Sequence, residues 1–144
     1  METLPRIRAG ALKMLTPVQE QFLRDHRLAV LATGRRDGSP QVSTIMYALH
    51  AGEIVISVTR DRAKWQNAVR QPKVSMLVNE GRKQLVVYGS ARTVRDDPER
   101  LALHKLIREA MGRPVDDEAE YLRLLDEQKR VILAITPDKV LMND

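Results

Sequence analysis

The chain has 144 residues, of which 43% are hydrophobic and 30% are charged, the size and composition of one ordinary globular domain. It contains no cysteine, which excludes disulfides, thiolate catalysis, zinc fingers and iron–sulfur clusters. Lysine and arginine outnumber the acidic residues by 24 to 19, and the resulting net charge of +5 suits an anionic partner.

The sequence favours neither a membrane nor a nucleic acid as that partner. No apolar run approaches the ~18 residues of a membrane span, and the N-terminal region lacks the continuous apolar segment of a signal peptide. The basic residues are scattered, and one tryptophan, three tyrosines and one phenylalanine are too few for the stacking platforms of single-strand binding. We therefore expect a cytoplasmic protein with no membrane and no nucleic-acid partner.

The first strong structural signal is the start of a helix. Thr16 is suited to the N-cap, Pro17 to the first helical position, and Gln19 to the third position of a capping box. Val18, Phe22 and His26 follow at four-residue intervals, the spacing of one helix face. The sequence predicts a helix that begins at Pro17 and ends near Arg27.

Strands follow this helix and are joined by short turns. Asp37-Gly38 and Ala51-Gly52 are typical hairpin turns between β-prone runs. Some of these runs carry apolar residues on both faces, which is typical of a closed antiparallel barrel. The predicted strands are 28–33, 41–49, 53–59, 73–80 and 83–94.

The C-terminal third is predicted to contain two helices and a closing strand. Asp97-Pro98 begins one helix, which Gly112 ends, and a second helix runs over 117–129. A strand over 130–136 closes the domain, and a short β-prone run follows it. The fold class is α+β, with a single barrel domain over 1–144 and peripheral helices. Its parts are a tail (1–15), a helix with the main strands (16–95), two helices (96–129) and the closing strand with a tail (130–144).

Side chains for acid–base, nucleophilic or metal chemistry are poorly placed in this sequence. There is no Gly-x-Ser-x-Gly elbow, and the three histidines show neither triad nor metal-ligand spacing. The acidic pairs at 96–97 and 116–117 each precede a helix, where capping explains them. We expect no metal site and assign no catalytic residue, so any difficult chemistry would belong to a bound cofactor.

The segment 57–67 is the best candidate for a binding site. It passes from the end of a strand into a short helix and carries Arg62 and Lys64 around the first helical turn. Cations are unfavourable at a helix N-terminus unless an anion lies among them. Ser57 and Thr59 add hydroxyl donors nearby. From the residues alone, an anion site and a solvated basic turn are equally supported.

The order of motifs along the chain resembles the pyridoxamine 5′-phosphate oxidase-like split β-barrels. The run LATxxxDGxPQ is followed by a strand, then by T-x-x-x-x-K-x-x-N, then by P-x-V-S. The resemblance is strong from Thr16 to Val94 and weaker from Arg130 onward. Within this group the chain is most similar to the small actinobacterial proteins that use the deazaflavin coenzyme F-420.

This resemblance implies a homodimer with two equivalent cofactor sites at the subunit interface. It assigns the cofactor phosphate to Lys64, helped by Arg62, and places Asn67 close by. Arg130 would contribute from the partner subunit, and Trp65 remains mainly a packing residue. The resemblance also implies that two strands contact the tricyclic ring of the cofactor. The residues that run along the ring are Gln41, Ser43, Thr44, Ile45 and Met46, and those that lie beneath it are Ser57, Val58 and Thr59.

The function implied is hydride transfer from reduced coenzyme F-420 to an unsaturated small organic substrate. The alternatives are an FMN-binding oxidoreductase of the same fold and a non-catalytic cofactor- or haem-binding protein, although none of the three histidines is expected in the pocket. Tyr47 and Tyr88 are the polar-tipped aromatics on strands and thus candidate proton donors, although each is better explained as a barrel residue. Vitamin B6 oxidation is not expected, because the C-terminal substrate-phosphate motifs of the true oxidases are missing.

Overall fold

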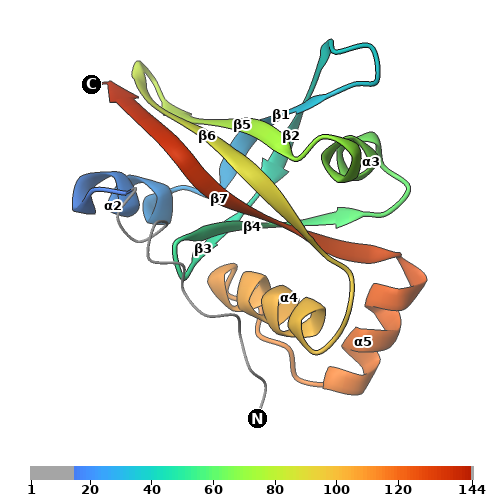
Figure 1. Ribbon diagram of the computed structural model, residues 1–144. Coiled ribbons are helices and arrows are strands. Elements are labelled where there is room, and N and C mark those ends of the chain that lie inside the picture. Colours follow the sequence, from blue (N-terminus) through green and yellow to red (C-terminus); the bar gives the residue numbers. More distant parts are fainter. Residues whose placement is uncertain (1–14, 144) are drawn as a thin grey trace.

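The computed structural model describes residues 15–143, so the predicted tail lies almost entirely outside the described residues. The described part contains four helices and seven strands (Figure 1). The helices are α2 (Pro17–Asp25), α3 (Ala63–Arg70), α4 (Glu99–Ala110) and α5 (Glu118–Glu127). The strands are β1 (Leu28–Gly34), β2 (Pro40–Met46), β3 (Ala48–His50), β4 (Glu53–Thr59), β5 (Lys73–Glu80), β6 (Lys83–Val94) and β7 (Arg130–Asn143).

All seven strands form one antiparallel sheet in the order β2-β1-β5-β6-β7-β4-β3. Strands β2 and β3 lie at opposite edges of this sheet, and yet a single residue, Tyr47, separates them in the chain. The sheet must therefore curl until its two edges approach each other. The result is the predicted α+β split β-barrel.

The predicted strand 41–49 is wrong in this respect, because the structure divides it at Tyr47. The Tyr47 amide donates to the carbonyl of Arg27, and its hydroxyl donates to the carbonyl of Leu23 at 2.7 Å. Both bonds hold the corner against the end of α2. The β-propensity of the run continues across this corner, so the pattern gave no sign of the break.

The predicted helix start is confirmed, although the helix ends at Asp25 rather than near Arg27. The predicted apolar face is wrong in one residue, because Phe22 is buried whereas Val18 is exposed. The Thr16 hydroxyl accepts from the Gln19 amide, and the Gln19 side chain accepts from the Thr16 amide. This reciprocal capping box satisfies two amides that the first helical turn leaves free. It fixes the helix beside the corner at Tyr47.

Strand β4 and the first part of β7, over 130–137, are buried on both faces. Ile54 and Ile56 of β4 point into the barrel interior, whereas Val55 faces the other way and packs with Ile132 and Leu103. Leu103 belongs to α4, so this helix covers the outer face of the two strands. In Figure 1, α4 and α5 lie together below β4 and β7. Residues that alternate with the barrel interior on β4 therefore face a helix rather than water.

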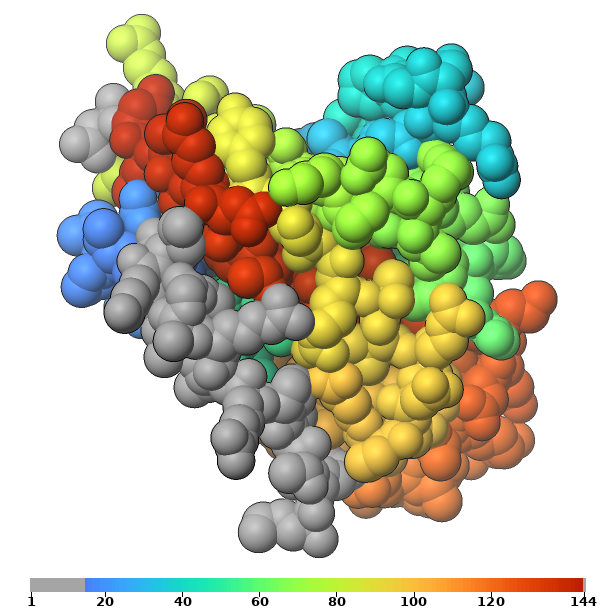
Figure 2. Space-filling view, in the orientation of Figure 1, coloured from blue at the N-terminus to red at the C-terminus, as the bar shows by residue number. Residues whose placement is uncertain are grey.

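The closing strand is longer than predicted. The runs 130–136 and 139–142 belong to one strand, β7, which pairs with β6 from Gln84 to Val94 across an irregularity at Tyr88 and Gly89. Strands β6 and β7 are thus the two longest strands and lie side by side in the inner part of the sheet. Figure 2 shows the tip of the β1–β2 hairpin projecting away from this body, with α4 and α5 packed at the opposite end.

Candidate functional site

A pocket of about 430 Å³ lies where the edge strand β2 faces β4 and the helices α4 and α5. This volume lies within the range of small-molecule and cofactor sites. Its lining residues are Thr44, Ile45, Met46, Ser57, Lys64, His104, Ile107, Arg108, Met111, Tyr121, Leu124, Leu125, Gln128 and Arg130. Six of the residues assigned to the cofactor by resemblance are among them: Thr44, Ile45, Met46, Ser57, Lys64 and Arg130.

Lys64 enters the pocket from the first turn of α3. Its Nζ donates to the Ser43 hydroxyl of β2 at 3.3 Å. Burial lowers the pKa of Lys64, and the positive charges of Arg62 and Arg130 lower it further. The helix has no acidic residue in its first turn and no side-chain cap at Arg62. An anion bound here would relieve this crowding of positive charge.

Arg130 reaches the same pocket from the first residue of β7. It pairs with Thr59 across the sheet, and its Nε donates to the Gln128 side chain at 3.3 Å. The resemblance implied that this arginine acts from a partner subunit. The structure places it close enough to Lys64 of its own chain to lower the pKa of that lysine.

The position predicted for His104 is wrong. His104 was expected outside the pocket, and the structure puts it in the lining, where its Nε2 lies 2.8 Å from the Ser57 hydroxyl. Its Nδ1 lies 2.8 Å from the carbonyl oxygen of Arg100. The residue is 2% exposed, and this burial lowers the pKa of His104 to about 4, so the imidazole is neutral at pH 7.

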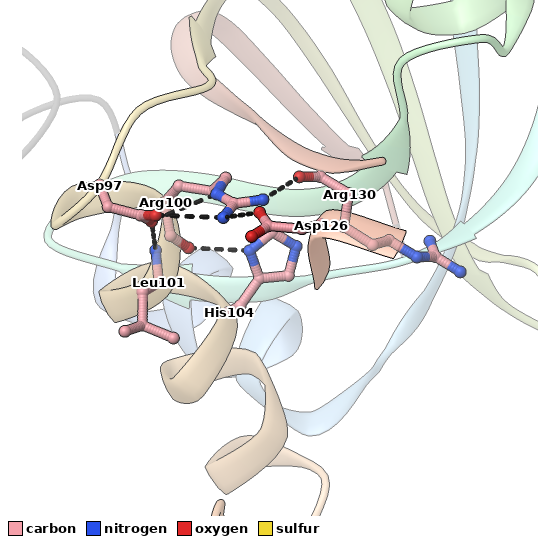
Figure 3. A network of polar contacts seen from close by, with 6 residues as sticks. All are labelled: Asp97, Arg100, Leu101, His104, Asp126 and Arg130. Atoms are coloured by element: carbon pink, nitrogen blue, oxygen red, sulfur yellow. Dashed lines mark hydrogen bonds and ion pairs between the residues drawn. The ribbon is translucent and has the colours of Figure 1, made fainter. Parts of the chain in front are cut away.

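A polar network behind His104 fixes the start of α4 (Figure 3). The Arg100 guanidinium donates to Asp97, to Asp126 and to the backbone carbonyl of Arg130. These partners come from the loop before α4, from α5 and from β7. The network therefore fixes the position of His104 and the backbone position from which the Arg130 side chain extends.

The far wall of the pocket is apolar and comes from α4 and α5. Ile107, Met111, Leu124 and Leu125 form it, together with Tyr121. The Arg108 guanidinium lies 5.1 Å from the centre of the Tyr121 ring, and burial raises the pKa of Tyr121. The pocket thus has a basic side and an apolar side, which suits a ligand that is anionic at one end and ring-like at the other.

The two tyrosines named as candidate proton donors lie elsewhere. Tyr47 is buried and its hydroxyl is bonded to the Leu23 carbonyl. Tyr88 is exposed beside a different hollow on the outer face of the sheet. Tyr121 lines the pocket instead. It was missed because its helical context carries no chemical signal in the sequence.

Asn67 and Gln41 meet in another hollow, on the side of α3 that faces the β1–β2 hairpin. The Asn67 amide donates to the Thr33 hydroxyl at 3.1 Å, and this hydroxyl donates to Gln41. Arg70 donates to the Asn67 side-chain oxygen and to the backbone of the hairpin. Asn67 and Gln41, both predicted cofactor ligands, therefore take part in hydrogen bonds that connect α3 to β1 and β2.

The remaining predicted residues lie around the pocket without lining it. Val58 is buried in the barrel core, and Thr59 lies at the end of β4 opposite Arg130. Arg62 is exposed at the N-cap of α3 and contributes positive charge to the Lys64 environment. Ser43 does not line the pocket, but its hydroxyl accepts a hydrogen bond from Lys64, which does.

Neither a metal centre nor a membrane-spanning helix is found in the described part of the chain. Over residues 15–143, no group of three or more histidines and carboxylates is gathered closely enough to hold a metal ion. In the same range, no helix has both the length and the apolar character needed to cross a membrane.

Comparison with known proteins identifies a family and a fold. The family model described as pyridoxamine 5′-phosphate oxidase matches residues 15–144. A conserved hypothetical protein from Mycobacterium tuberculosis is 24% identical, with a TM-score of 0.77 over 97% of this chain and 90% of that one. An F-420 reductase is also 24% identical, with a TM-score of 0.70 over 88% of this chain and 98% of that one. A haem storage protein from Vibrio cholerae is 19% identical, with a TM-score of 0.62 over 88% of this chain and 93% of that one.

Proposed function

Because this chain belongs to the pyridoxamine 5′-phosphate oxidase family, we propose that it is a redox protein that binds a flavin-like cofactor by its phosphate. The cofactor of this proposal is coenzyme F-420, and the reaction is hydride transfer to an unsaturated small organic substrate. The similarity to an F-420 reductase supports this choice at the level of the fold.

The observation that carries the proposal is the excess of positive charge around the pocket. Lys64 and Arg130 line its basic side, Arg108 lies on the far wall beside Tyr121, and no carboxylate lines the pocket among the described residues. Lys64 is part-buried between other positive charges, which lowers its pKa and leaves the site short of a negative charge. Charge-assisted bonds to a phosphate are the natural complement of such a site.

The rest of the pocket fits the ring of such a cofactor. Lys64 and Arg130 would hold the phosphate, while Thr44, Ile45 and Met46 would lie along the ring. The bound cofactor supplies the hydride. The residues of this chain hold and orient the two reactants, and the apolar wall from α4 and α5 excludes water. Tyr121 is the hydroxyl on that wall which could hold a proton near the substrate.

FMN is the second candidate, because its phosphate would use the same Lys64 and Arg130. Haem binding is the third, and the haem storage protein from Vibrio cholerae shares the fold. His104 lines the pocket, but both of its ring nitrogens already have hydrogen-bond partners. Haem ligation would have to break one of these bonds, which favours a flavin-like cofactor.

The active form in this proposal is a homodimer. Val30, Leu77, Val86 and Leu141 pair directly with one another in one row across β1, β5, β6 and β7 on the outer face of the sheet. Val30 and Leu141 of this row are exposed, as are Leu28 and Met46 beside it. Neighbouring exposed apolar side chains of this kind are typical of an interface. Met46 also lines the pocket, so a second subunit on this face would border the site.

A titration of the purified protein with coenzyme F-420 and, separately, with FMN tests the cofactor. We expect tight F-420 binding and a loss of affinity of about 10- to 100-fold in Lys64→Ala, the equivalent of one or two charge-assisted hydrogen bonds. Arg82→Ala, which removes the same charge from the exposed β5–β6 turn, is the matched control.

Tighter binding of FMN than of coenzyme F-420 would identify FMN as the cofactor. Binding of hemin alone would support a haem-binding protein. Equal affinity of wild type and Lys64→Ala for every cofactor would contradict the phosphate site.

A further inference from the structure

The Ser57 hydroxyl in the pocket has its hydrogen-bond direction set by His104. The Nδ1 of His104 faces the Arg100 carbonyl, which has no hydrogen to give, so Nδ1 must carry the proton and donate. Because the imidazole is neutral, Nε2 is then left with a lone pair. The Ser57 hydroxyl, 2.8 Å away, must donate to it.

Ser57 is therefore left with its oxygen lone pairs for the pocket. A serine hydroxyl has a single proton, and here that proton is committed to a buried neighbour. An unconstrained serine would rotate to suit either a donor or an acceptor. This serine offers only an acceptor to whatever lies in front of it.

The direction is held firmly because His104 has little freedom to move. It is 2% exposed and belongs to α4, on the side of this helix that faces β4. That part of α4 is fixed by Arg100, which binds Asp97, Asp126 and the Arg130 carbonyl (Figure 3). A tautomer change would leave the ring Nδ1 lone pair against the Arg100 carbonyl oxygen, which is repulsive.

We propose that Ser57, with its polarity set by His104, selects ligands that present an N–H or O–H group to this part of the pocket. This inference rests on the proposed function, because Lys64 and Arg130 must hold the anionic end of the same ligand. In an oxidised flavin-like ring the group concerned is the imide N–H of the pyrimidinedione. Ser57 is then a specificity residue, and His104 is the residue that positions it.

The test compares two probes that differ by one hydrogen-bond donor. They are 5-deazaflavin mononucleotide and its derivative methylated at the imide nitrogen, titrated into wild type, Ser57→Ala, His104→Phe and the double variant. Ser90→Ala is the matched serine control, since the Ser90 hydroxyl bonds to Asp138 away from the pocket. Lys64→Ala is included to show that the phosphate site is engaged.

We expect the parent probe to bind wild type about 10-fold more tightly than the methylated one, as the loss of one hydrogen bond to a buried acceptor predicts. Ser57→Ala should weaken the parent by about 10-fold and leave the methylated probe within about 2-fold. His104→Phe should reduce the ratio between the probes to about 3-fold, because the freed hydroxyl can then turn to donate. In the Ser57→Ala background, the same change should leave the ratio unaltered.

Equal affinity of the two probes, with both dependent on Lys64, would overturn this inference and leave the proposed function standing. A His104→Phe variant that weakens both probes alike would also overturn it, since this is what mere packing predicts. Should His104→Phe not fold, wild type and Ser57→Ala still decide the matter through the two probes. Binding of neither probe in a Lys64-dependent way would overturn the proposed function and this inference together.

Discussion

The Arg100 guanidinium and the Asp126 carboxylate meet at 2.7 Å and tie the first turn of α4 to the last turn of α5. Arg100 also donates to the backbone carbonyl of Arg130, so the two helices and β7 are joined at one buried cation. The apolar wall of the pocket and one of its basic residues depend on this junction. It therefore connects the stability of the helical layer to the shape of the site.

The junction can be tested by Arg100→Met, which keeps the apolar stem and removes the charge. The side chain is 7% exposed, so we expect the free energy of unfolding to fall by about 2 kcal/mol, as in the loss of a buried hydrogen-bonded charge. Urea unfolding measures this change. Arg123→Met is the control, because its ion pairs with Glu120 and Glu127 are exposed and should contribute nothing measurable. An equal loss in both variants would contradict the role of the junction.

Stability should depend on pH through His104. Its pKa is about 4 in the folded protein against an ordinary value of 6.5, so between these values the unfolded chain binds a proton that the folded chain does not. Stability is then full above pH 6.5 and falls as the pH drops toward 4, by about 3 kcal/mol in total. Unfolding of wild type and His104→Phe at pH 7 and pH 4.5 isolates this contribution. Parallel pH dependences in the two proteins would contradict it.

Tyr47 should act in folding and not in cofactor chemistry. Tyr47→Phe removes the buried hydrogen bond to the Leu23 carbonyl, which still accepts from the His26 amide. We expect a loss of about 1 kcal/mol in the free energy of unfolding, with unchanged affinity for coenzyme F-420. Tyr88→Phe, at an exposed position, is the matched control and should change neither quantity. A Tyr47→Phe variant of full stability would show that the corner does not need this bond.

The outer face of the sheet should mediate dimer formation. Val30 lies within the apolar row across β1, β5, β6 and β7, and Val30→Glu would place a charge in the middle of an interface. We expect light scattering after gel filtration to give the mass of a dimer for wild type and of a monomer for Val30→Glu. Val18→Glu, on the exposed side of α2, should remain dimeric. A monomeric wild type at micromolar concentration would contradict the proposal.

Local signals predicted most of the elements. The capping box at Thr16 and the turn pairs at Gly38 and Gly52 act between near neighbours, so their effect can be read without the fold. The bounds of β4, β5 and β6 are those expected from their apolar runs. The corner at Tyr47 was missed because the bonds that hold it reach residues 20 or more positions earlier.

The sequence by itself identified Lys64 as a candidate anion ligand, because cations near a helix N-terminus are locally unfavourable without a counter-charge. Only the tertiary structure decided what surrounds this lysine. Ser57 and His104 are 47 positions apart, and they meet because β4 presents one face to α4. Lys64 and Arg130 are also remote in the chain, and they share a pocket because β7 pairs with β4. Such contacts depend on strand pairing and helix packing, which join residues without leaving any mark on their neighbours in sequence.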